Sequence, residues 1–164
     1  MNLNFRRAQA RPTGTKLDPT NLPPGTFIQG WRVLKKLGQG GYGAVYLVEL
    51  NGRLFALKLA LHRADSGDAA RTDARLLREL ACLGLLHHPH IVRVWGHGRW
   101  PDPEEGFLFI VIDYVDGPTL AEWMEQAHPT FRELLALLEK VAAALGGSHA
   151  RGVLHRDLKP SNLL

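Results

Sequence analysis

The sequence predicts an α+β fold in two parts, an antiparallel sheet of five strands with one helix, followed by a body made of helices. Up to residue 112, short runs rich in β-branched and aromatic residues alternate with turn signals. Asn51-Gly52, the strongest short hairpin signal, separates two of these runs. After residues 113–118 the leucines recur at helical spacing. The 164 residues, 45% of them apolar, are enough to bury one core or slightly more.

The composition is typical of a segment that works inside the cell. A single cysteine, Cys82, excludes an internal disulfide framework and suits a reducing compartment. No apolar run approaches the roughly 20 residues of a membrane span. Residues 1–7 are followed by polar residues rather than by a signal-peptide core. We therefore expect a cytoplasmic location.

The net charge of +4 comes from the beginning of the chain. Four of the 20 Lys and Arg residues precede the first acidic residue, Asp18: Arg6, Arg7, Arg11 and Lys16. The other 16 basic residues balance the 16 acidic ones, so the remainder is neutral. A basic groove for nucleic acid is therefore not expected.

Residues 1–26 are rich in proline and lack apolar periodicity, which predicts a flexible basic leader. The domain is expected to begin near Phe27. The five predicted strands span residues 31–37, 44–50, 53–60, 91–95 and 107–112.

A glycine-rich segment, Gly38-Gln39-Gly40-Gly41-Tyr42-Gly43, joins the first two of these strands. In a dinucleotide-binding fold it would open a helix, and a Walker A loop would continue with Gly-Lys-Ser or Gly-Lys-Thr. Neither context is present. Glycines let backbone N–H groups approach phosphate oxygens that a Cβ would obstruct. A glycine-rich hairpin without a ligand is the competing interpretation.

Lys58 lies inside the apolar strand 53–60, where a lysine usually needs a partner for its charge. The helix predicted over residues 68–86, from leucines at helical spacing, offers Glu79 as that partner. A surface pair between Glu79 and Arg75 is the alternative.

The run His87-His88-Pro89-His90 ends this helix. We interpret it as a proline-marked turn rather than a metal site, because no cysteine or carboxylate accompanies it at a useful spacing. In the second part, a short helix is predicted over residues 120–126. A longer helix is predicted to begin at Thr130, with Glu133 completing a capping box, and to stop at Gly152.

The chain then reaches His155-Arg156-Asp157-Leu158-Lys159-Pro160-Ser161-Asn162. These residues bring an acid, an amine and an amide within six positions, and Pro160 prevents the segment from continuing as a helix. The composition indicates an active-site loop. A charged loop with a chance proline is the other interpretation.

Taken in order, these motifs resemble those of a eukaryotic-type (Hanks-type) serine/threonine protein kinase of bacteria. The sequence between the motifs resembles in particular that of myxobacterial kinases. The motifs are Gly38-x-Gly40-x-x-Gly43-x-Val45, Ala56-Leu57-Lys58, Glu79 and the 155–162 loop. The resemblance covers about residues 27–164. It implies a protein-kinase-like fold with an N-lobe over 27–112, a hinge over 113–117 and part of a helical C-lobe over 118–164.

The resemblance implies ATP and Mg²⁺ as ligands, and the serine or threonine hydroxyl of a protein as phosphate acceptor. Lys58, held by Glu79, would bind the α- and β-phosphates. Asp157 would accept the hydroxyl proton, Lys159 would offset phosphate charge, and Asn162 would bind magnesium. The residues implied to contact ATP are Leu37, Gly38, Gly40, Gly43, Val45, Ala56, Lys58, Ile112, Asp113 and Val115.

The resemblance stops where the family continues to its Asp-Phe-Gly segment, activation loop and remaining helices. We therefore expect a kinase fragment that is inactive or weakly active by itself. A pseudokinase, or an ATP-binding interaction module without catalysis, is the alternative. The intact Lys58, Glu79, Asp157 and Asn162 favour catalysis, and Lys159 with the complete glycine loop favours a protein kinase over a small-molecule phosphotransferase.

Overall fold

A computed structural model describes residues 18–41, 43–63 and 69–164. The chain divides into two compact units. The sheet unit holds the described residues up to Arg78 together with Val94–Asp113, and the helical unit holds Glu79–Arg93 and Tyr114–Leu164. Helix α1 (Ala69–Gly84) begins in the first unit and ends in the second.

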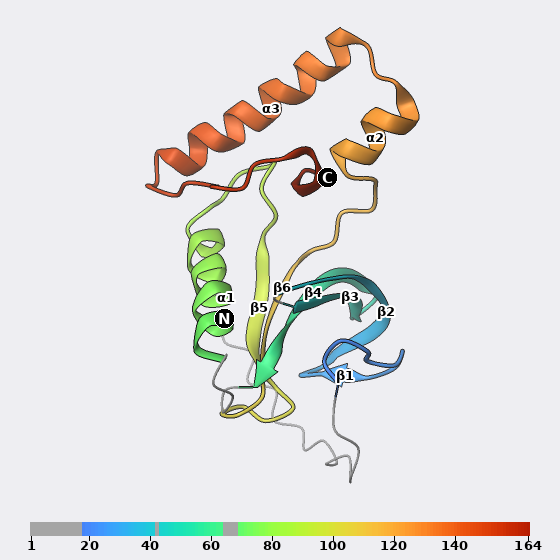
Figure 1. Cartoon of the computed structure of the whole chain (residues 1–164), viewed down its shortest axis with the longest axis vertical. Coiled ribbons are helices and arrows are strands. Elements are labelled where there is room, and N and C mark those ends of the chain that lie inside the picture. The colour runs from blue at the N-terminus through green and yellow to red at the C-terminus, as the bar shows by residue number, and fades with distance from the viewer. Residues whose placement is uncertain (1–17, 42, 64–68) are drawn as a thin grey trace. The chain divides into compact units, whose positions relative to one another are not determined.

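The sheet unit is built on an antiparallel sheet whose strands follow the order β1-β2-β3-β4-β6-β5 (Figure 1). The strands are β1 (Phe27–Ile28), β2 (Trp31–Gly40), β3 (Gly43–Leu50), β4 (Arg53–Arg63), β5 (Val94–Trp100) and β6 (Phe107–Asp113). The predicted antiparallel sheet is confirmed. The two-residue β1 is added to the five strands expected.

Strand β1 pairs with β2 through a two-residue turn in which Ile28 lies opposite Trp31. The turn residues Gln29 and Gly30 both have positive φ, 48° and 96°, as a type I′ hairpin requires. Glutamine is not a typical residue for the left-handed region, so the sequence carried no signal for this turn.

The hairpin predicted at Asn51-Gly52 is confirmed, with Leu50 opposite Arg53 and φ values of 53° and 78° at the two turn residues. The Glu49 carboxylate accepts a hydrogen bond from the Gly52 N–H at 2.6 Å. This bond lowers the pKa of Glu49, and the bond from Arg32 lowers it further by a smaller amount. The carboxylate therefore stays ionised and holds the turn.

The fourth predicted strand was misplaced, because the structure has Val94–Trp100 where residues 91–95 were expected. The two glycines of this strand differ: a Cβ at Gly98 would lie closer to its neighbours than ordinary contact allows, whereas one at Gly96 would make ordinary contacts. A Cβ at Gly96 would lie 3.5 Å from the Trp31 ring, and one at Gly98 would lie 3.2 Å from the Phe109 ring.

One face of the sheet forms the core of this unit. Its buried residues are Leu22, Ile28, Val33, Ala44, Tyr46, Val48, Phe55, Leu57, Leu59, Trp100, Phe107, Phe109 and Val111. Because side chains alternate along a strand, the intervening residues Val45, Lys58 and Ile112 lie on the opposite face.

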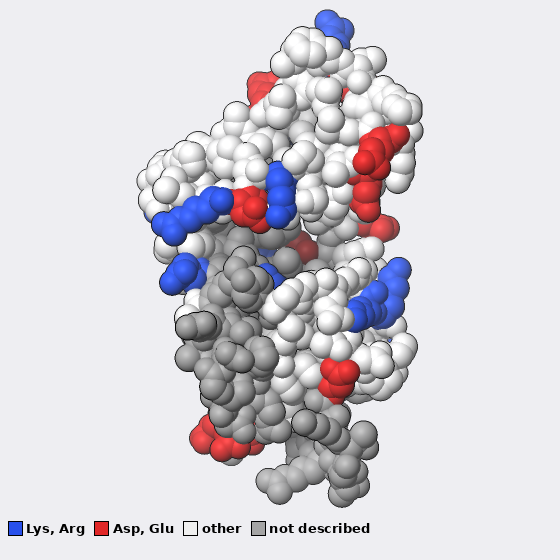
Figure 2. All heavy atoms as spheres, in the orientation of Figure 1, with Lys and Arg blue, Asp and Glu red and all other residues white. Residues whose placement is uncertain are grey.

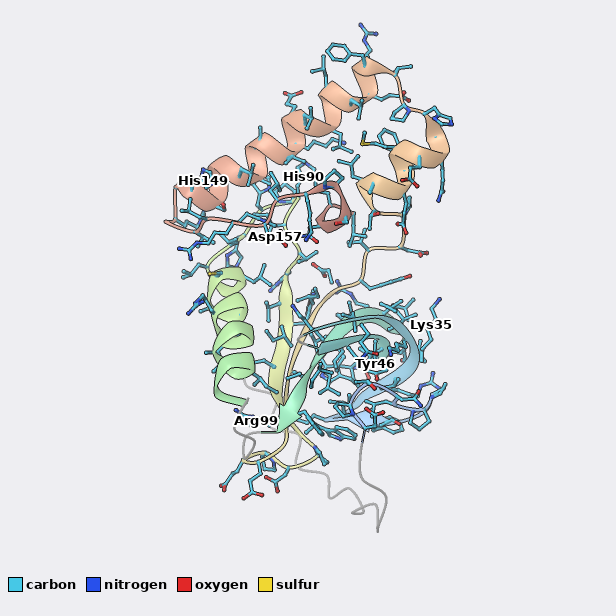
Figure 3. The ribbon with its side chains drawn as sticks, in the orientation of Figure 1. Lys35, Tyr46, His90, Arg99, His149 and Asp157 are labelled. Atoms are coloured by element: carbon cyan, nitrogen blue, oxygen red, sulfur yellow. The ribbon has the colours of Figure 1, made fainter. Side chains whose placement is uncertain are left out.

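The predicted leader contributes to this core from Asp18 onward, while residues 1–17 lie outside the described residues. Leu22 is 7% exposed and belongs to the core cluster. The Tyr46 hydroxyl donates to the Pro19 carbonyl at 2.8 Å and accepts from the Leu22 N–H at 3.1 Å (Figure 3). Burial raises the pKa of the Tyr46 hydroxyl, which keeps its proton for this bond.

The helical unit contains α2 (Leu120–Ala127), α3 (Phe131–His149) and the 3₁₀ turn η1 (Pro160–Asn162), with the Leu120 N–H bonded to the Leu163 carbonyl at 2.8 Å. The capping box predicted at Thr130 and Glu133 is confirmed. A second capping box, at Thr119 and Glu122, was not predicted. Helix α3 ends at His149, before Gly152, which has a φ of 72°.

On the face drawn in Figure 2, the Lys and Arg side chains of the described residues are interspersed with Asp and Glu side chains. The same face thus presents no continuous basic surface within the described part of the chain. Within that part, no helix combines the length and the apolar character needed to cross a membrane.

We expect Tyr46→Phe to lower the free energy of unfolding by about 1–3 kcal/mol, because it leaves the buried N–H of Leu22 and the carbonyl of Pro19 without their partner. Tyr114→Phe, which removes an exposed bond to Asp116, is the matched control and should have a smaller effect. Urea unfolding followed by tryptophan fluorescence measures both. Equal losses would show that the two hydrogen bonds of the Tyr46 hydroxyl do not stabilise the sheet unit.

Candidate active site

The predicted site residues divide between the two units, and each set is described within its own unit. The sheet unit holds Leu37, Gly38, Gly40, Gly43, Val45, Ala56, Lys58, Ile112 and Asp113. The helical unit holds Glu79, Val115, Asp157, Lys159 and Asn162. Glu79 lies within α1, but its side chain lies outside the described part of the structure. Its predicted pairing with Lys58 depends on that side chain and stays a prediction.

The glycine-rich segment closes the β2–β3 hairpin, with Gly40 opposite Gly43, so the predicted strand-to-strand context is confirmed. A Cβ at Gly43 would lie 2.5 Å from the carbonyl oxygen of Leu59 on β4, so packing requires this glycine. Gly38 and Gly40 differ, because no heavy atom of the described residues, chain neighbours aside, lies within 4 Å of where their Cβ would be. Packing within the described residues therefore does not explain these two glycines.

Lys58 lies in a row of paired residues that runs across three strands, from Val45 on β3 through Lys58 on β4 to Ile110 on β6. The row two residues further along contains Ala56 and Ile112. Paired residues of antiparallel strands share a face, so Val45, Ala56, Lys58 and Ile112 lie on one face. Ala56 is buried and the other three are half-buried. The sheet therefore brings the predicted phosphate-binding amine beside the predicted adenine-contacting side chains.

Two further predicted residues are more exposed. Leu37, on β2, is 40% exposed, and Val115, in the segment that follows β6, is 39% exposed. Both expose apolar surface that a ligand could cover.

Asp113 is the last residue of β6, and its side chain makes contacts that sequence reasoning missed. Its Oδ1 accepts a hydrogen bond from the Trp95 Nε1–H at 2.7 Å and lies 3.5 Å from the Arg53 guanidinium. That guanidinium also lies over the Trp95 ring, 4.1 Å from its centroid. We call these three residues the Asp113 clamp. They are far apart in sequence, and the signal that could have found them is a tryptophan directly before the Gly-His-Gly run of β5.

In the helical unit, the loop after α3 brings the acid, the amine and the amide of the 155–162 segment into contact. Lys159 Nζ lies 3.0 Å from Asp157 Oδ2. Asn162 Nδ2 donates to the Asp157 carbonyl at 2.8 Å and to Asp157 Oδ2 at 3.1 Å. Pro160 begins the 3₁₀ turn that brings Asn162 back toward Asp157, whose position is labelled in Figure 3.

The entry to this loop is fixed by Ser148, the buried polar residue near the end of α3. Its Oγ lies 2.9 Å from the Val153 carbonyl and 3.1 Å from the Leu145 carbonyl, and its own carbonyl accepts from the Val153 N–H at 3.0 Å. A serine at the end of a leucine-rich stripe was the available signal, and sequence reasoning did not use it.

The hydrogen bond from Lys159 lowers the pKa of the Asp157 carboxyl most, and the hydrogen bond from Asn162 lowers it further. Asp157 is therefore ionised at neutral pH. Both donations by Asn162 come from its amide nitrogen, which leaves the amide oxygen for another partner. An amide oxygen beside a carboxylate is a donor set that suits magnesium.

Residues 31–164 match the family model described as the protein kinase domain. The chain belongs to the protein kinase family. It is 34% identical, over 142 residues, to the probable serine/threonine-protein kinase PknB of Lactococcus lactis, covering 84% of this chain and 22% of PknB. It is 36% identical, over 148 residues, to the serine/threonine-protein kinase PknF of Mycobacterium tuberculosis, covering 87% of this chain and 30% of PknF. The predicted kinship to bacterial serine/threonine kinases is confirmed.

The fold comparison agrees with this family. The crystal structure of the Mycobacterium tuberculosis PknI kinase domain matches with a TM-score of 0.67 at 36% identity, covering 87% of this chain and 56% of that one. A second PknI kinase domain structure matches with a TM-score of 0.66 and is covered to 59%. The kinase chain described here thus spans a little over half of the solved kinase domain and less than a third of PknB or PknF.

We expect Lys159→Met to raise the pKa of Asp157 toward its ordinary value of 3.8, because the hydrogen bond that lowers this pKa most is lost. Asn162→Ala should raise it as well, by a smaller amount. Carboxyl-carbon NMR titration measures the change. Asp18, whose pKa is lowered by hydrogen bonds from Thr20, serves as the internal control and should not respond. An unchanged pKa for Asp157 in Lys159→Met would contradict the pairing of these two residues.

Proposed function

We propose that this kinase chain binds MgATP and that its catalytic loop acts in transfer of the γ-phosphate to serine or threonine hydroxyls of a protein. The observation that carries the proposal is the Asp157, Lys159 and Asn162 cluster, in which Lys159 Nζ lies 3.0 Å and Asn162 Nδ2 lies 3.1 Å from the carboxylate oxygen of Asp157. The names of the relatives support the serine/threonine specificity. The cytoplasm, which supplies ATP, is the compartment that fits this activity.

Two lobes are part of the proposal. Residues 27–112 form the N-lobe, 113–117 the hinge and 118–164 part of the C-lobe. In the N-lobe, the backbone N–H groups of the glycine loop bind phosphate oxygens, because side chains at Gly38 and Gly40 would only obstruct a ligand. Gly43 serves the loop by letting β3 approach β4.

Lys58 binds the α- and β-phosphates, and Glu79 holds the lysine in place. The half-buried position of Lys58 beside apolar neighbours strengthens its attraction for an anionic ligand, since the local dielectric is lower than in water. Val45, Ala56 and Ile112 enclose the adenine from the same sheet face, and Leu37 adds to this enclosure. Backbone groups of Asp113 and Val115 bond the adenine edge.

Asp157 accepts the hydroxyl proton and orients the hydroxyl for in-line attack on the γ-phosphate. A carboxylate with a lowered pKa is a weak base, so orientation is its larger contribution. Phosphoryl transfer suits this role, because it depends on positioning and charge stabilisation more than on covalent help from the protein. Lys159 then offsets negative charge on the transferred phosphate.

Asn162 supplies its amide oxygen to magnesium, while its amide nitrogen remains bonded to Asp157. When bound, the metal neutralises charge on the phosphates. The two hydrogen bonds from Asn162 fix the direction of its amide and thus the position of the ligand oxygen.

We expect Lys58→Met to weaken MgATP binding by roughly 10- to 150-fold, the effect of losing a hydrogen bond to a charged group. Isothermal titration calorimetry on the 164-residue chain measures this. Lys35→Met is the matched control, because Lys35 is an exposed lysine of β2 outside the proposed site (Figure 3). Equal affinities for the two variants would remove Lys58 from the nucleotide site.

Catalysis is tested on a chimera in which this chain is followed by the part of the PknI kinase domain that lies beyond the matched region. We expect Asp157→Asn to lower the rate of phosphate transfer to a serine-containing peptide by about 10²- to 10⁴-fold while leaving the dissociation constant of MgATP unchanged. Radiolabelled transfer and calorimetry measure the two quantities. A chimera that binds MgATP but transfers no phosphate, before any substitution, would favour the pseudokinase alternative.

A further inference from the structure

The β2 side of the glycine loop carries a single side chain. Residues 38–41 are Gly-Gln-Gly-Gly, so Gln39 is the residue through which other side chains can hold this part of the loop. Its Oε1 accepts a hydrogen bond from Lys36 Nζ at 2.5 Å. Both residues belong to β2 and lie three positions apart. We call this pair the Lys36–Gln39 brace.

The brace spans an irregularity in the pairing of β2 with β3. Lys36 lies opposite Tyr46 and Gly38 lies opposite Val45, so Leu37 is passed over. A β-bulge of this kind bends the strand, because the extra residue leaves the ladder. The direction in which the glycine loop continues therefore depends on the backbone torsions at the bulge. A bond that joins the residues on either side of the bulge restrains those torsions.

The brace lies on the sheet face opposite Lys58. Paired residues of antiparallel strands share a face. Lys36 is paired with Tyr46 and Gln39 with Ala44, and both partners belong to the buried core. Lys58 lies on the other face. The brace can therefore hold the loop without occupying the space proposed for the phosphates.

A second interaction of Lys36 agrees with this placement. Hydrogen bonds from Thr20 lower the pKa of the Asp18 carboxyl most, and the charge of Lys36 lowers it further by a smaller amount. Lys36 therefore lies near the segment that begins at Asp18. That segment packs on the core face through Leu22, so its position fits an ammonium group directed to the core face.

We propose that Lys36 and Gln39 are positioning residues that hold the glycine loop in the conformation that binds the phosphates of the nucleotide. The inference rests on the proposed function, since it concerns the phosphate contacts proposed for this loop. Glycines permit many backbone conformations, and the fraction of the free protein in the binding conformation sets the observed affinity. The brace raises this fraction by restraining the bulge. A ligand without phosphates gains nothing from it.

The test compares the affinities of the 164-residue chain for MgATP and for adenosine, which has no phosphates, by isothermal titration calorimetry. Lys36→Met removes the donor of the brace and Gln39→Ala removes the acceptor. We expect each to raise the dissociation constant of MgATP by roughly 2- to 12-fold, the effect of one hydrogen bond, and to leave that of adenosine unchanged. The double variant should bind MgATP no more weakly than the weaker single variant, because both substitutions break the same bond.

Lys35→Met is the matched control, because it removes the same charge from the neighbouring residue of β2 and leaves the brace in place. It should leave both dissociation constants unchanged. Lys36→Arg keeps a charged donor and should retain more of the affinity for MgATP than Lys36→Met.

The outcomes separate this inference from the proposed function. A loss in Lys36→Met that Gln39→Ala does not share, or that Lys35→Met reproduces, would mean that Lys36 acts through its charge, which overturns the inference. A parallel rise in the dissociation constant of adenosine would overturn it as well, since the brace would then stabilise the sheet in general. In both cases the proposed function stands. If the unsubstituted chain does not bind MgATP, the proposed function fails and the inference fails with it.

Discussion

The pairing register of β3, β4 and β6 is the constraint on which the sheet unit depends. Lys58 lies between Val45 and Ile110 in one row of paired residues, and its neighbour Leu57 lies in the next row, among fully buried residues. A slip of one residue would exchange the two faces, burying the Lys58 ammonium in the core at a cost of several kcal/mol or more. The Asn51-Gly52 turn prevents this slip by fixing where β4 begins, and the Glu49 carboxylate holds the turn.

Features determined by neighbours in the sequence could be predicted from it. The Asn51-Gly52 hairpin and the Thr130 capping box are each complete within four residues, and both formed where expected. The contacts of the 155–162 loop are equally local, since Asp157 and Asn162 bond across a single 3₁₀ turn that Pro160 begins. In each case the interaction energy and the chain geometry come from the same short segment, so no distant contact is needed to specify it.

Features that depend on distant contacts could not be predicted. The extent of β5 was missed because Gly96 and Gly98 interrupt the apolar pattern of a strand, while the rings beside them belong to Trp31 and Phe109, which are distant in the sequence. The packing of Leu22 depends on Tyr46, whose hydroxyl supplies two bonds that the proline-rich segment lacks within itself. The contact between Trp95 and Asp113 depends on a bulge, and no local pattern specifies a bulge.

The glycine loop contains one glycine that packing requires and two that packing among the described residues does not require. Gly43 is required by the fold, since any Cβ there would collide with the Leu59 carbonyl. At Gly38 and Gly40 side chains would fit among the described residues without such a collision, and glycine at these positions costs conformational entropy in the folded strand. Packing among the described residues therefore gives no reason for glycine at these two positions. Under the proposed function the reason is a phosphate group close to the backbone, which would also be the ligand of Lys58 on β4.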